Sequence, residues 1–81
     1  MSTQTQTLAL VQHLISLITE RPAEEILPGQ RLYEDLQMDS LQITELAQKI
    51  ETETGKSIDE DLLAAEGATV ALCVDVTDAA S

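Results

Sequence analysis

The sequence predicts an all-α fold: a small four-helix bundle, with three main helices, one short third helix and a long first loop. Two stretches carry apolar residues at helical spacing. Residues suited to helix capping stand where the helices are expected to begin. No two segments alternate as paired strands would, and a lone strand is not stable. The 81 residues suffice for one small domain and not for two, so we expect a single domain over 1–81.

The first helix is expected at about residues 5–19, with residues 1–5 disordered before it. Pro22 limits its C-terminal end. The helical period is carried by four apolar residues: Leu8, Val11, Ile15 and Ile18.

Residues 20–36 form the long first loop, because they contain both prolines and show no sustained period. A short helical turn is expected around Ala23–Ile26, since Pro22 suits the first position of a helix. Five residues of the loop are expected to hold it on the core: Ile26, Leu27, Leu32, Tyr33 and Leu36.

The second helix is expected to begin at about Ser40 and to end near Gly55, which suits a C-terminal cap. Asp39 and Gln42 have the spacing of a capping box at its start. Its buried face follows the helical pattern of Ile43, Leu46, Ala47 and Ile50.

Two further helices follow. Ser57 and Glu60 suggest a capping box that opens a short third helix over about 58–65. Thr69 caps a fourth helix over about 69–79, although its valines also alternate as in a strand. The tail, residues 79–81, is expected to be frayed.

The charge of the chain excludes some partners. There are 15 acidic and 4 basic residues, giving a net charge of −11. Nucleic acid and anionic membrane surfaces would repel such a chain. The acid excess indicates either a partner with a basic face or a well-solvated surface, and it favours a monomer.

The single Cys cannot form an internal disulfide, and one Cys with one His cannot supply a structural zinc site. The N-terminal residues lack the basic start of a signal peptide, and the apolar stretch over 8–18 is too short to cross a bilayer. We therefore expect a cytoplasmic protein.

The sequence does not support an enzyme. His13 and Cys73 are interpreted as a packed helical histidine and a small buried thiol, since no base and nucleophile are brought together. The acidic run 59–61 lacks the ligand pattern of a calcium loop and is interpreted as a solvated helix start. No catalytic and no metal-binding residue is assigned.

Ser40 allows two interpretations. At the start of an amphipathic helix it can be half of an N-terminal cap. It can also be the attachment point of a phosphate-linked group, because the unpaired N–H groups and the positive end of the helix dipole favour a phosphodiester there.

The surrounding residues favour the second interpretation. Residues 32–41, Leu-Tyr-Glu-Asp-Leu-Gln-Met-Asp-Ser-Leu, continue into Ile43-Thr44-Glu45-Leu46. This segment resembles the acyl carrier protein family, whose signature is an acidic-Leu turn followed by Asp-Ser-Leu at the start of the second helix. The resemblance extends over nearly the whole chain, from the first helix to the Thr69-Val70 start of the fourth.

The resemblance implies a carrier and not a catalyst. By family, Ser40 would be esterified by 4′-phosphopantetheine, which a phosphopantetheinyl transferase takes from coenzyme A. The terminal thiol of this arm would hold acyl groups as thioesters and bring them to partner enzymes at high effective concentration. Partner recognition would involve Asp39, Leu41, Glu45, Glu51 and Glu53. The partners implied are an acyltransferase or ligase, a ketosynthase and other pathway enzymes with basic docking patches.

Some positions depart from the family pattern. Gln37 stands where the family usually has Gly, and it carries a steric cost if the turn needs a positive φ. Thr54 replaces an aromatic residue that commonly closes the second helix. Gln42, Thr44 and Gln48 make this helix less acidic than in carriers of fatty acid synthesis.

These departures, together with the sequence Met-Asp-Ser-Leu over 38–41, favour a discrete carrier of a polyketide or related specialised pathway. A carrier for fatty acid synthesis and an aminoacyl or peptidyl carrier remain alternatives. An unmodified acidic helical binding module, in which Ser40 is only a cap, is the alternative from a different class.

Overall fold

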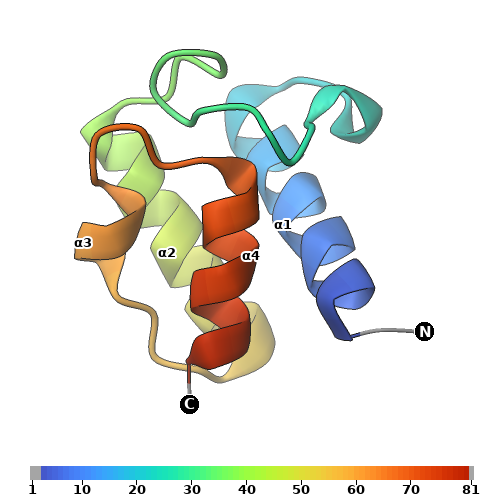
Figure 1. Ribbon diagram of the computed structural model, residues 1–81, viewed down its shortest axis with the longest axis vertical. Helices are drawn as coiled ribbons and strands as arrows, with labels where there is room; N and C mark the ends of the chain where they lie inside the picture. Colours follow the sequence, from blue (N-terminus) through green and yellow to red (C-terminus); the bar gives the residue numbers. More distant parts are fainter. Residues whose placement is uncertain (1–2, 81) are drawn as a thin grey trace.

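The structure is a computed structural model and describes residues 3–80. Its helices are α1 (Thr3–Thr19), α2 (Ser40–Thr54), α3 (Glu60–Leu63) and α4 (Val70–Ala79), with a 3₁₀ turn η1 at Ala23–Glu25. Figure 1 shows α4 beside α1, and α1 also packs against α2. The short α3 lies on the outer side and contacts α2 and α4. The all-α four-helix prediction is confirmed.

The long first loop crosses one end of the bundle, and the C-terminus lies at the opposite end (Figure 1). In the described residues the only β-type pairing is an isolated bridge between Arg31 and Thr69. No helix of the described residues is long and apolar enough to span a membrane.

The helix α1 begins at Thr3, so residues 3–5, which were expected to be disordered, are helical. Met1, Ser2 and Ser81 lie outside the described residues. At the other end of α1, Glu20 adopts the left-handed conformation at φ 61°. Its N–H donates a hydrogen bond to the Ser16 carbonyl. The chain therefore leaves the helix before Pro22, as predicted.

The third helix is shorter than the predicted 58–65, and its cap is Asp59 rather than Ser57. The reason is tertiary: Ile58 is buried, and its N–H donates to a carboxylate oxygen of Glu51 at 2.9 Å. This contact holds the chain outside a helix until Asp59, whose side chain accepts from the Asp61 N–H at 3.1 Å.

The fourth helix is confirmed against the strand interpretation. The hydroxyl of Thr69 accepts from the Leu72 N–H at 3.1 Å and caps the helix start. The C-terminal tail differs from expectation, since Ala79 is the last residue of α4 and Ala80 packs half-buried against the core.

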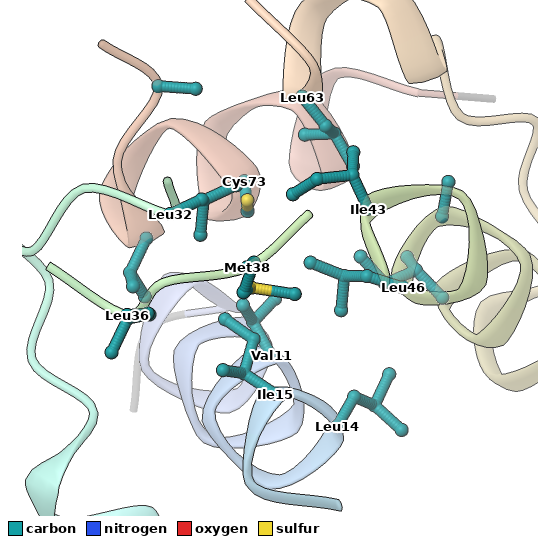
Figure 2. Close-up of a cluster of buried hydrophobic side chains, with 14 of the residues drawn as sticks. Val11, Leu14, Ile15, Leu32, Leu36, Met38, Ile43, Leu46, Leu63 and Cys73 are labelled. Carbon is teal, nitrogen blue, oxygen red and sulfur yellow. The ribbon is translucent and has the colours of Figure 1, made fainter. Parts of the chain in front are cut away.

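The core is aliphatic and is completed from the loop (Figure 2). Ile26, Leu32 and Leu36 of the loop are buried as predicted, but Leu27 is 53% exposed and does not hold the loop. Met38 is 3% exposed, and Figure 2 shows its side chain directed between α1 and α2. The segment before Ser40 is thus fixed by packing.

Backbone hydrogen bonds tie the same loop to the start of α4. Leu32 donates to the Ala68 carbonyl at 2.9 Å, and Val70 donates to the Gln30 carbonyl at 3.0 Å. Within the loop, Met38 donates to the Leu32 carbonyl at 3.0 Å. Buried backbone groups need such partners, so the loop has one defined path across the end of the bundle.

Met38→Ala is expected to lower the free energy of unfolding by about 2–4 kcal/mol, because it removes a buried side chain and leaves a cavity. Urea denaturation followed by circular dichroism measures this loss. Leu27→Ala, at an exposed position of the same loop, is the matched control and should cost less than about 1 kcal/mol. Equal losses in the two variants would contradict the anchoring role of Met38.

Candidate functional site: the serine at the start of α2

Ser40 is the first residue of α2, and its side chain is exposed. The cap itself is formed by Asp39 and Gln42, which bond reciprocally. A carboxylate oxygen of Asp39 accepts from the Gln42 N–H at 2.8 Å, and the Gln42 side-chain oxygen accepts from the Asp39 N–H at 3.1 Å. The predicted capping box is confirmed, and within the described residues no hydrogen bond engages the Ser40 hydroxyl.

The start of α2 also keeps backbone donors available. Gln42 donates to the Asp39 side chain and Ile43 donates to the Asp39 carbonyl, at 2.8 and 2.9 Å. The first four N–H groups of a helix have no intrahelical partner, and the capping box engages those of Asp39 and Gln42, so those of Ser40 and Leu41 remain for a ligand. Together with the positive end of the helix dipole, they suit a phosphate ester on the neighbouring hydroxyl.

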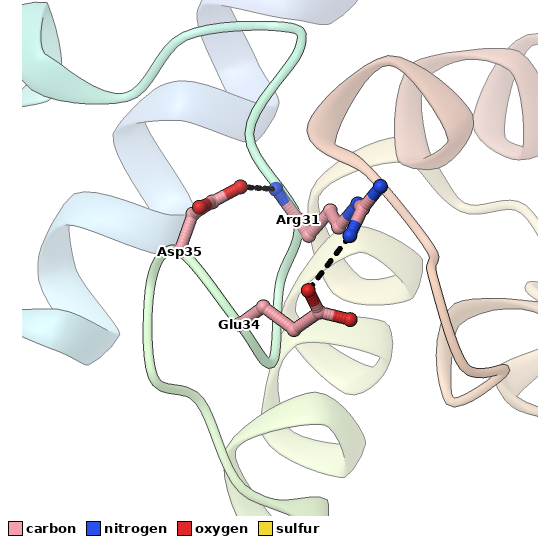
Figure 3. Close-up of polar contacts among 3 residues, drawn as sticks. All are labelled: Arg31, Glu34 and Asp35. Carbon is pink, nitrogen blue, oxygen red and sulfur yellow. Dashed lines mark hydrogen bonds and ion pairs between the residues drawn. The ribbon is translucent and has the colours of Figure 1, made fainter.

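A compact turn over residues 31–36 leads to the serine (Figure 3). The Asp35 carboxylate accepts from the Arg31 N–H at 2.8 Å, and the Arg31 guanidinium pairs with Glu34 at 2.7 Å. The hydrogen bond to Glu34 and its negative charge raise the pKa of Arg31. Both side chains of this pair are exposed to solvent, at 54% and 55%, so we assign the turn's shape to its backbone bonds and not to the ion pair.

Gln37 has a φ of 56°, in the left-handed region that favours glycine. The steric cost expected for Gln at this position is therefore present. Its neighbour Met38 is buried and precedes the capping residue Asp39. The strained residue thus lies between the acidic turn and the anchored start of α2.

The residues expected to recognise partners do not share one role. Leu41 is 81% exposed, and Glu45 and Glu53 are exposed on α2. The latter two line a groove between α1 and α2. Glu51 is different, because its half-buried carboxylate accepts from the Ile58 N–H at 2.9 Å and fixes the loop before α3.

Sequence reasoning missed Met38 as the anchor of the site. A signal was available: Met38 directly precedes the cap, and Ile43 lies four positions after the cap. These are the positions of a hydrophobic staple, and both side chains are buried. The inward role of Glu51 had no comparable local signal, since it depends on the path of a later loop.

The two residues considered for catalysis, His13 and Cys73, take no part in the site around Ser40. His13 is exposed on the α1–α2 groove, so the prediction of a packed histidine is wrong. Cys73 is fully buried as predicted, and this burial raises the pKa of its thiol to about 12. In the described residues, no group of three or more His, Cys, Asp or Glu side chains is placed to hold a metal ion.

The site and fold define a class: a small helical bundle that presents an exposed serine at the start of its second helix. A family model described as a phosphopantetheine attachment site matches residues 9–75. Because this covers most of the chain, the protein belongs to that family. No curated protein gives a significant match to the sequence.

Membership defines the group that the protein carries. The domain that defines this family is the site of covalent 4′-phosphopantetheine attachment. Proteins with this domain are generally carriers rather than catalysts. A carrier of this kind interacts with a phosphopantetheinyl transferase and with the enzymes of its pathway. The exposed hydroxyl beside two available N–H groups fits the phosphate end of such an arm.

Gln37→Gly is expected to raise the free energy of unfolding by about 1 kcal/mol, because glycine adopts a positive φ without the steric cost. Gln37→Ala keeps that cost and serves as the control, since the exposed Gln37 side chain loses little on truncation. Urea denaturation of the three proteins tests this. A glycine variant no more stable than the alanine variant would show that φ at this position is not limiting.

The buried thiol also predicts a pH dependence of stability. Folding raises the pKa of Cys73 from 9.0 to about 12, so above pH 9 the unfolded chain loses a proton that the folded chain keeps. The thiol contribution is fully present below pH 9 and falls by up to about 1.4 kcal/mol per pH unit as the pH rises toward 12.

Unfolding free energies measured from pH 8 to pH 11 should therefore fall more steeply in the wild type than in Cys73→Ala, which lacks the thiol. Tyr33 and the lysines are common to both proteins, so the difference in slope isolates Cys73. Parallel curves would contradict the protonated, buried state of the thiol.

Proposed function

We propose that Ser40 is the residue that carries 4′-phosphopantetheine, and that the protein is an acyl carrier. The observation that supports this best is that the cap of α2 is formed by residues other than Ser40. Asp39 and Gln42 form the cap, so the exposed hydroxyl of Ser40 has no structural duty and can be esterified without unfolding the helix.

The neighbouring residues act on the position of that hydroxyl. Asp39 fixes where α2 begins, and buried Met38 holds the preceding backbone against the core. The N–H groups of Ser40 and Leu41 are placed to donate to phosphate oxygens. When bound, the group supplies a thiol on a long flexible arm, to which acyl groups are attached.

Partner enzymes are proposed to meet the exposed side of α2. Leu41 offers an apolar contact next to Ser40, and Glu45 and Glu53 offer charge to a basic patch. Asp39 contributes indirectly, because as the cap it fixes where α2 begins and so where Ser40 lies. We assign Glu51 to the loop before α3 instead, because its carboxylate already accepts the Ile58 N–H.

For the pathway, we propose polyketide or related specialised biosynthesis, with fatty acid synthesis and peptidyl transfer as the alternatives. The support is the low acidity of α2, where Gln42 is engaged in the cap and Gln48 is exposed. An acyltransferase or ligase and a ketosynthase are the partners this implies. An unpaired cysteine suits the cytoplasm as the place of action.

The test of Ser40 is intact mass after incubation with coenzyme A and a broad-specificity phosphopantetheinyl transferase. The wild type is expected to gain the mass of one phosphopantetheine, whereas Ser40→Ala gains none. Ser57→Ala is the control, because Ser57 is also exposed and should leave the modification intact. Circular dichroism checks that each variant is folded.

A modified Ser40→Ala, or an unmodified but folded wild type, would overturn the assignment. The second result would favour the unmodified binding module. Pathway choice is tested next, by offering the loaded protein to ketosynthases of polyketide and of fatty acid synthesis. Faster transfer to the fatty acid enzyme would reject the polyketide proposal.

A further inference from the structure

A second surface, remote from Ser40, has the character of a docking site. It is a shallow groove of about 330 Å³ between α3 and the C-terminal half of α4. We name it the α3–α4 groove. Its apolar lining, which we call the floor, is Leu62, Val76, Ala79 and Ala80. Its polar lining, which we call the rim, is Ser57 and the two carboxylates of Asp59 and Asp75.

The floor is available to a partner. Leu62 is 48% exposed, which makes it one of four large apolar side chains with substantial exposure in the described residues. Val76 and Ala80 are half-buried, and Ala79 is exposed. An apolar side chain placed on this floor would remove further apolar surface from water, which favours binding.

The charge of the rim is not compensated. Asp59 and Asp75 are both exposed, and in the described part of the chain neither takes part in an ion pair. Lys56, the nearest base in sequence to Asp59, instead donates to the Thr77 carbonyl at 3.1 Å and does not line the groove. The groove is therefore apolar within and negative at its edge.

This combination selects one kind of occupant. A second copy of the chain carries the same net charge of −11 and is repelled, and an anionic membrane is repelled likewise. The groove between α1 and α2 is less selective, because Lys49 lines it together with Glu45 and Glu53. We propose that the α3–α4 groove docks a short amphipathic segment of a basic partner protein, with an apolar side chain on Leu62 and Lys or Arg at Asp59 and Asp75.

The position of the groove separates this contact from the site of attachment. Ser40 begins α2 at the end of the bundle crossed by the long loop, and Ala79 ends α4 at the opposite end (Figure 1). The 15 residues of α2 span about 22 Å between these ends. A partner in the α3–α4 groove thus leaves Ser40 and Leu41 open to an enzyme.

The experiment uses the unmodified chain, so it does not depend on Ser40 being the attachment point. Isotope-labelled protein is titrated at low salt with a synthetic amphipathic peptide of leucine and lysine, and amide shifts are followed by NMR. The largest shifts are expected at Leu62, Asp75, Val76 and Ala79. A peptide of the same pattern with glutamate for lysine should not bind.

Two pairs of substitutions remove the same charge from different places. Asp59→Asn with Asp75→Asn is expected to weaken binding about three- to tenfold, and asparagine keeps the cap of α3. Glu24→Gln with Glu25→Gln, at two exposed acids of η1, should change it less than about twofold. Leu62→Ser should weaken it about tenfold or more with the rim charges intact.

Equal weakening by the two charge pairs would show general attraction to an acidic protein and would overturn the proposal. Shifts centred on the start of α2 or on the α1–α2 groove would overturn it as well, as would absence of binding. Failure here leaves the assignment of Ser40 untouched, since that rests on a separate measurement of mass.

Discussion

The reciprocal bonds between Asp39 and Gln42 are the interaction on which the site depends. A helix must satisfy its first N–H groups, and a serine near the start of a helix often serves that need as the N-cap. Here Asp39 is the cap, so the Ser40 hydroxyl is exposed and makes no hydrogen bond while the start of the helix is still capped. The anchored Met38 and the strained Gln37 then determine the direction from which the chain enters that cap.

Local patterns were sufficient to predict most of the fold. The periods of α1 and α2, the box at Asp39 and the cap at Thr69 are each encoded within a few residues, and the structure follows them. The prediction failed where distant residues decide. The start of α3 is set by the hydrogen bond from the Ile58 N–H to Glu51. Leu27 is exposed although its apolar side chain suits the core.

The same distinction applies to the acidic residues of the site. The sequence shows that the chain is acidic, but not which carboxylates are used internally. Asp39 caps α2, Asp35 closes the turn before it, and Glu51 holds the loop after it. Only the remainder, such as Glu45 and Asp75, is free to act through its field on another protein. Counting acids therefore overestimates the number of carboxylates that have no hydrogen bond within the protein.

The ties between the long loop and the start of α4 bear on when the protein becomes competent during synthesis. Leu32 and Gln30 are bonded to Ala68 and Val70, which the ribosome adds nearly forty residues later. A nascent chain that has released α1 and α2 still lacks these partners, so its loop is not yet tied to the start of α4. Domains fold as units. The setting of Ser40 is therefore complete only once the last helix is in place.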